Sequence, residues 1–139
     1  MQRKGLAAAA MCMLFLVSGC SNQANAGISV LDEPAADDRT LPANLYRGEM
    51  EPDSARFVGE HEGISYFLAK PADPGMAGGV CIVAVEAESS ACDGPSNVDT
   101  QLATLGVAGA EARVVRDGAN TTDLTDDGWT QVHENLLVR

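Results

Sequence analysis

An apolar run near the N-terminus ends at Cys20 and decides how much of the chain is left to fold. Residues 5–17 are apolar or small, and they follow the basic pair Arg3 and Lys4. This run is shorter than the roughly 20 residues that a transmembrane helix needs, but it has the length of the apolar region of an export signal. We therefore predict that residues 1–19 are removed, which leaves 120 of the 139 residues to form the mature protein.

The residues before the predicted cleavage point indicate a lipidated signal. Val17, Ser18 and Gly19 precede Cys20, and lipoprotein signals use this order of an aliphatic residue, two small residues and a cysteine. The Cys20 thiol would carry a diacylglyceryl group, with acyl chains such as palmitate, and Cys20 would become the new N-terminus. Two or more acyl chains suffice for stable anchoring, since each buried methylene contributes about 0.8 kcal/mol. We predict a protein anchored by lipid to the extracytoplasmic face of the cell membrane, with a plain export signal or an uncleaved anchor as the alternatives.

The mature chain is strongly acidic. Loss of Arg3 and Lys4 leaves seven basic residues against 20 acidic ones, a formal net charge of −13. Such a surface is repelled by nucleic acids and by anionic lipid headgroups. We therefore expect no nucleic-acid partner, and we expect the lipid on Cys20 to be the contact with the membrane.

Residues 20–53 have the composition of a flexible acidic tether. They are rich in Asn, Ala, Asp, Glu and Pro, with only scattered apolar residues. The acidic run at residues 32–38 is predicted to be a solvated spacer. A flexible chain of this length would span about 30 Å on average. Residues 41–46 are the one place where the tether is expected to dock as a short turn.

Residues 54–139 predict a small all-β domain. Residues 56–60 and 64–69 read as two strands of a hairpin, because apolar and polar residues alternate in the second strand and Gly63 can supply the positive φ of the turn. The expected fold is a small antiparallel sheet, or a partly open barrel or sandwich, built from hairpins.

The strongest predicted strand is the β-branched run at residues 79–85, which is apolar on both faces and therefore central in its sheet. The chain is expected to return beside it at residues 91–93. This brings Cys92 toward Cys81. With Cys12 removed and Cys20 lipidated, two cysteines remain in an oxidising compartment, and we predict a disulfide between them.

The C-terminal third is less clear from its pattern. Residues 102–109 are compatible with a strand or a helix, and we favour a strand. Residues 110–114 alternate as a strand should. Residues 129–132 and 136–138 are expected to form a broken final strand that closes the sheet, with Trp129 as the largest apolar group available to the core.

Several of these segments together resemble small, uncharacterised lipoproteins of actinobacteria. The resemblance covers about residues 40–139 and rests on glycines, aromatic residues and the cysteine pair. It implies an all-β domain on a lipid anchor, and it brings no catalytic residue with it. The segments concerned are residues 54–63, 66–69, 80–83, 91–92, 113–118 and 128–129.

One stretch has the spacing of a calcium-binding loop. Asp123, Thr125, Asp127 and Glu134 fall at positions 1, 3, 5 and 12 of the helix-loop-helix pattern, with Gly128 at position 6. The flanking residues do not predict an entering helix, and a turn followed by a strand explains the same residues. We therefore predict no metal and no cofactor, and we keep a calcium-stabilised domain as an alternative.

Catalytic patterns are not found in the sequence. The two histidines, His61 in a predicted tight turn and His133 near the C-terminus, are expected to be solvated loop or edge residues, and no serine lies in a nucleophile-elbow pattern. Phosphate-binding and dinucleotide-binding motifs are also missing. We predict that the protein is not an enzyme but a binding or accessory module of the cell envelope, with an envelope protein or a small ligand as its partner. A hydrolytic enzyme is the less favoured alternative.

Overall fold

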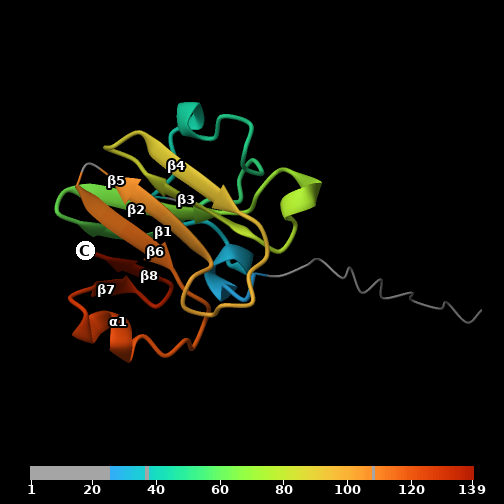
Figure 1. Ribbon diagram of the computed structural model, residues 1–139. Coiled ribbons are helices and arrows are strands. Elements are labelled where there is room, and N and C mark those ends of the chain that lie inside the picture. The colour runs from blue at the N-terminus through green and yellow to red at the C-terminus, as the bar shows by residue number, and fades with distance from the viewer. Residues whose placement is uncertain (1–25, 37, 108) are drawn as a thin grey trace, which may run out of the picture.

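The computed structural model describes residues 26–36, 38–107 and 109–139. The predicted signal at residues 1–19, the lipidation site Cys20 and the first residues of the predicted tether lie outside this part of the chain. The described residues form two antiparallel sheets of four strands each, which face each other (Figure 1). The all-β prediction is therefore confirmed. The two sheets form a sandwich and not a closed barrel.

The first sheet is a meander in which each strand pairs with the next one along the chain. The predicted hairpin is present: His61 is opposite Ile64, and the turn residues Glu62 and Gly63 have φ angles of 50° and 79°. All five residues of the third strand are buried, as its apolar sequence predicts. The strands are β1 (Arg56–His61), β2 (Ile64–Ala69), β3 (Val80–Ala84) and β4 (Ser89–Asp93), in the order β1-β2-β3-β4.

The second sheet is formed by the C-terminal part of the chain, from residue 103 to residue 138. Its strands are β5 (Ala103–Val107), β6 (Ala110–Val114), β7 (Thr130–His133) and β8 (Leu136–Val138), in the order β5-β6-β8-β7. The strand interpretation of residues 102–109 is thus confirmed over β5. The C-terminal segment differs from the single broken strand that we expected, because β7 folds back on β8 as a hairpin and β8 lies inside the sheet beside β6.

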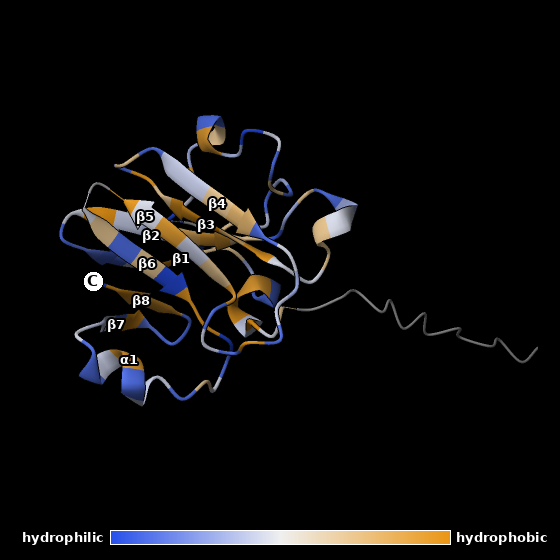
Figure 2. Cartoon of the chain, viewed as in Figure 1, coloured by the Kyte–Doolittle hydropathy of each residue, from blue (hydrophilic) through white to orange (hydrophobic). Residues whose placement is uncertain are grey.

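The main core lies between the two sheets and consists of the inward-facing residues of both, including Leu68, Ile82 and Leu136. The apolar residues of the strands are seen as orange bands in Figure 2. At one side of the sandwich β1 and β7 lie next to each other. Gly59 permits this contact, because a Cβ atom at that position would meet Val132 Cγ1 at 2.5 Å. At the other side β4 lies next to β5.

The segment from residue 26 onward differs from the predicted tether. A short 3₁₀ helix, η1 (Ser29–Asp32), packs against the end of the sandwich, and Ile28 and Leu31 are buried in the main core. Two apolar residues three positions apart share one face of a 3₁₀ turn, so this polar stretch can cover an opening in the core. The domain therefore begins by residue 26 and not at residue 54.

The second half of the predicted tether covers the outer face of the first sheet. A 3₁₀ turn, η2 (Ala43–Leu45), lies there, and Leu41, Leu45 and Met50 pack against Phe67. The expected docking of residues 41–46 is confirmed. The segment was predicted to be flexible because its apolar residues are sparse, yet each of these three is buried.

The predicted disulfide is present beneath this covering segment. Cys81 in β3 and Cys92 in β4 are directly opposite each other, with an S–S distance of 1.99 Å and a Cα–Cα distance of 4.0 Å. Both belong to the apolar cluster that residues 41–55 cover.

A third, smaller cluster covers the outer face of the second sheet. Trp129 packs there with Val115 and Leu137, and Leu124 of the helix α1 (Thr122–Asp126) lies against it. Trp129 is therefore buried outside the main core, which corrects the expectation that it contributes to that core. Within the described ranges, no helix combines the length and the apolar character needed to cross a membrane.

Candidate functional site

The end of the sandwich where the N-terminal segment docks is organised by Arg116. This residue follows β6, and its guanidinium makes three contacts. Nη1 donates to the carbonyl oxygen of Ala26 at 2.7 Å, Nη2 donates to that of Ser96 at 2.8 Å, and Nε pairs with Asp99 Oδ1 at 2.7 Å. One side chain thus joins the N-terminal segment to the loop that connects the two sheets.

Asp117 adds a second set of contacts to the same segment. Its carboxylate accepts a hydrogen bond from the backbone N–H of Ser29 at 2.8 Å, and its own N–H donates to the carbonyl oxygen of Gly27 at 2.9 Å. Its other carboxylate oxygen accepts from Asn135 Nδ2 at 2.8 Å. Asn135 is 1% exposed, so this buried side chain fixes the position of Asp117. Asp117 in turn binds the backbone of Gly27 and Ser29.

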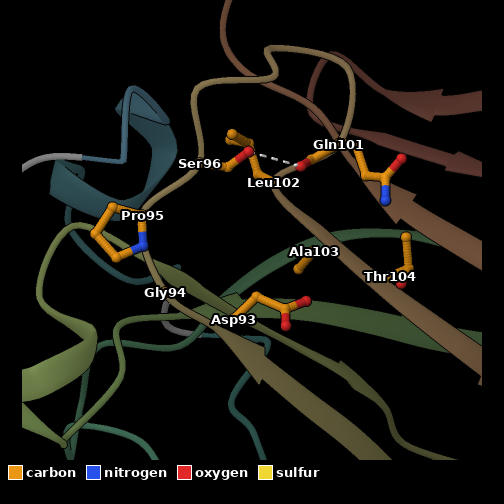
Figure 3. A pocket seen from close by; sticks show the side chains of 8 residues that line it. All are labelled: Asp93, Gly94, Pro95, Ser96, Gln101, Leu102, Ala103 and Thr104. Carbon is orange, nitrogen blue, oxygen red and sulfur yellow. Dashed lines mark hydrogen bonds between the residues drawn. The ribbon is translucent and has the colours of Figure 1, made fainter.

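An open hollow of about 370 Å³ lies beside this contact, between the end of β4 and the start of β5 (Figure 3). The carboxylate of Asp93 and the hydroxyl of Thr104 are among the polar groups that border it. The hydroxyl of Ser96 is used by the loop itself, because it donates to the carbonyl oxygen of Gln101 and accepts from the N–H of Val98. The lining residues are Asp93, Gly94, Pro95, Ser96, Gln101, Leu102, Ala103 and Thr104.

These groups can hydrogen-bond a polar ligand. Asp93 is the one acidic side chain of the lining, and the lining contains no histidine or lysine that could activate a hydroxyl. Across the described residues, no group of three or more His, Cys, Asp or Glu side chains is placed to hold a metal ion. The hollow therefore offers hydrogen-bonding groups and one carboxylate to a ligand.

Val98 lies in the same loop and is 55% exposed. It is the large apolar side chain that the described part of the chain leaves exposed. Since Ser96 of this loop is held by Arg116, the exposed valine and the N-terminal segment share one end of the sandwich. An isolated exposed valine is ordinary on a protein surface, so its significance depends on what faces it.

The candidate calcium ligands do not form a loop. Asp123 and Thr125 lie within α1, and the hydroxyl of Thr125 donates to backbone carbonyl oxygens of the same helix. Glu134 accepts a hydrogen bond from the N–H of Gly118. Asp127 caps the helix at its C-terminal end. A calcium loop needs oxygens that converge on one point, and a helical turn directs these side chains to different sides.

The two histidines lie at the ends of strands in different sheets. His61 ends β1, and His133 ends β7, where its Nδ1 accepts a hydrogen bond from the N–H of Asn135 at 3.1 Å.

The sequence did not indicate the structural roles of Arg116 and Asp117. The signal was weak, because each forms its contacts with residues 17 to 90 positions away in the chain.

Two ionisable groups of the first sheet have shifted pKa values. The carboxylate of Glu86 accepts hydrogen bonds from the N–H and the hydroxyl of Ser65 at 2.5 and 3.0 Å. Burial alone raises the pKa of Glu86, but these bonds and one from its own backbone outweigh it and hold the pKa below its ordinary value. Burial raises the pKa of Tyr66, and the charges of Glu62 and Glu86 raise it further. Tyr66 lies in β2 and Glu86 in the turn between β3 and β4, so neither group borders the hollow.

Comparisons of the chain with protein-family models, with curated proteins and with solved structures find no match. The site must therefore be interpreted from its own geometry. That geometry combines a docked N-terminal segment, an open polar hollow and an exposed valine at one end of the sandwich.

Proposed function

We propose that this protein is a lipid-anchored, non-catalytic module on the extracytoplasmic face of the cell membrane, which binds an envelope protein or a small polar ligand. The order of residues 17–20 and the apolar run before them support the anchor. The resemblance to small lipoproteins of actinobacteria agrees with it. The hydrogen-bonding groups that border the hollow support a binding role.

The observation that carries the proposal is the docking of the N-terminal segment. Ala26 is bound to Arg116 and lies only six positions after Cys20. Six fully extended steps span at most about 22 Å, at 3.3–3.6 Å each. A lipid on Cys20 would therefore hold this end of the sandwich, with the hollow and Val98, close to the membrane surface. A long tether would instead let the domain rotate freely.

The anchor can be tested by fractionation of cells that express the native chain and the Cys20→Ala variant. We expect the native protein in the membrane fraction with a mass that includes acyl chains, and the variant in the soluble or unprocessed fraction. A Cys92→Ala variant serves as the matched control, because it also loses a cysteine but keeps Cys20. Retention of Cys20→Ala in the membrane at unchanged mass would overturn the lipid anchor.

The binding role can be tested by crosslinking in intact cells, followed by purification of the anchored protein. A partner that is captured with the native chain and lost on Thr104→Arg, which obstructs the hollow, would support recognition at this site. The enzyme alternative predicts hydrolytic activity that His61→Ala or His133→Ala abolishes. The calcium alternative predicts a melting temperature that rises with calcium, returns with chelator and no longer responds in Glu134→Gln.

A further inference from the structure

A second surface lies on the outer face of the other sheet, where two arginines stack on the tryptophan. Trp129 is 4% exposed. The guanidinium carbons of Arg113 and Arg139 each lie 4.6 Å from the centroid of its ring. This distance is within the range of a cation–π interaction, so the ring positions both side chains. The result is a local concentration of positive charge on an acidic protein.

The two arginines differ in their other contacts. Arg139 is paired with Glu111: its Nη2 and Nε lie 2.9 and 3.2 Å from Glu111 Oε2. The backbones of the same two residues exchange two hydrogen bonds, so this pair is part of the sheet. The charge of Arg139 is therefore already compensated within the protein.

Arg113 has no such compensation. Its Nε atom is buried and has no hydrogen-bond partner. Among the described residues, no hydrogen bond or ion pair of its terminal nitrogens is found, and the guanidinium is in contact with the Trp129 ring. Arg56, Lys70 and Arg116, by contrast, all donate hydrogen bonds to protein oxygens. A guanidinium whose terminal nitrogens hold no protein oxygen can donate charge-assisted hydrogen bonds to an acceptor from outside the chain.

The position of Arg113 connects this surface to the hollow. Arg113 in β6 is directly opposite Thr104 in β5, and the neighbouring residues Ala103 and Leu105 point into the core. Opposite side chains on one face of a sheet have Cβ atoms about 4.5–5.5 Å apart. Thr104 borders the hollow, and Asp93 borders it from β4 (Figure 3). The order across the surface is thus Asp93, Thr104, Arg113 and Trp129.

We propose that Arg113 binds the carboxylate of a small polar ligand whose remaining part lies across Thr104 in the hollow. A guanidinium fork matches a carboxylate in geometry, and stacking on Trp129 fixes the plane of the fork. A monoanionic carboxylate is favoured over phosphate, because a second negative charge would be repelled by Glu111 and by the net charge of the protein. The carboxylate of Asp93 favours a ligand that also carries an ammonium group. A short peptide with free termini has both.

Trp129 provides the measurement, because it is the single tryptophan of the chain and is in contact with Arg113. The purified protein is titrated with the dipeptide alanylalanine at constant ionic strength, and tryptophan fluorescence is recorded. We expect a saturable change that alanylalanine amide, which lacks the carboxylate, does not produce. Inorganic phosphate is expected to bind more weakly than the dipeptide. Tighter binding of phosphate would overturn the assignment of the ligand as a carboxylate.

Two variants test whether Arg113 is the binding group. Arg113→Ala should weaken dipeptide binding by about tenfold or more, since a hydrogen bond to a charged group contributes on that scale. Arg39→Ala is the matched control, because Arg39 also stacks on an aromatic ring, at 4.3 Å from the centroid of Phe57, but on the outer face of the first sheet. Arg113→Lys, which keeps the charge but not the fork, guards against loss of folding in the alanine variant. Unchanged affinity in both Arg113 variants, or equal binding of the amide, would overturn the proposal.

Discussion

Arg116 Nη1 donates a 2.7 Å hydrogen bond to the carbonyl oxygen of Ala26, 90 residues away in the chain. This contact makes the N-terminal segment part of the folded domain. The same guanidinium also binds the carbonyl oxygen of Ser96 and the carboxylate of Asp99. The position of the N-terminal segment and the conformation of the loop between the sheets therefore both depend on the Arg116 side chain.

Arg116→Ala should lower the free energy of unfolding by about 2–3 kcal/mol. It removes two charge-assisted hydrogen bonds to carbonyl oxygens, whose strength is reduced by the partial exposure of the side chain, and an ion pair in which Asp99 is largely exposed. Urea unfolding measures the change, with Arg39→Ala as a control. Residues 26–33 should also become sensitive to protease. Native stability together with native protease resistance would show that the segment docks without Arg116.

Gly27→Ala should destabilise the protein more than Gly48→Ala. Both glycines have a positive φ, 74° and 73°, so the backbone strain of an alanine is alike. A Cβ atom at Gly27 would meet the Arg116 side chain at 2.7 Å, whereas nothing lies within 4 Å at Gly48. We expect a loss of about 1 kcal/mol at Gly48 and about 2 kcal/mol or more at Gly27. Equal losses in thermal or urea unfolding would mean that Arg116 moves aside without cost.

Removal of the disulfide should lower stability without any effect on membrane attachment. The bond between Cys81 and Cys92 closes a short loop, and the chain-entropy treatment gives about 3 kcal/mol for a loop of this size. The double variant with alanine at both positions is compared with the native protein by urea unfolding and by cell fractionation. Reduction of the native protein provides an independent measurement. Identical unfolding curves before and after reduction would contradict the prediction.

Glu86→Gln should make the free energy of unfolding depend less steeply on pH in the acidic range. The pKa of Glu86 is lower in the folded protein than in the unfolded chain, so its contribution is complete above the unfolded pKa and is lost as pH falls through the folded value. Other carboxylates also titrate in this range, so the measured quantity is the difference between native protein and variant from pH 7 to pH 3. The two profiles should converge at acidic pH. A constant difference at every pH would show that Glu86 acts through packing and not through its charge.

Local patterns in the sequence determined the strand content and the disulfide. The alternation at residues 64–69, the apolar run around β3 and the turn at Gly63 are properties of neighbouring residues, so they can be recognised without the fold. The cysteine pair followed from the number of cysteines that the predicted signal cleavage and lipidation leave over. These features survive in the structure because hairpins form between segments adjacent in the chain.

Only the tertiary structure decided how the polar segments are used. Residues 26–53 have the composition of a tether, but Ile28, Leu31 and Met50 meet openings that distant strands create, and their burial holds residues 28–31 and the chain near Met50 against the sheets. In the same way, the sequence of β6 shows an arginine on an outward face, but not that Arg113 stacks on Trp129 and lacks an acceptor. The composition of a segment and the periodicity of its apolar residues indicate only the secondary structure that the segment favours by itself. Which groups it meets depends on the packing of residues far apart in the chain.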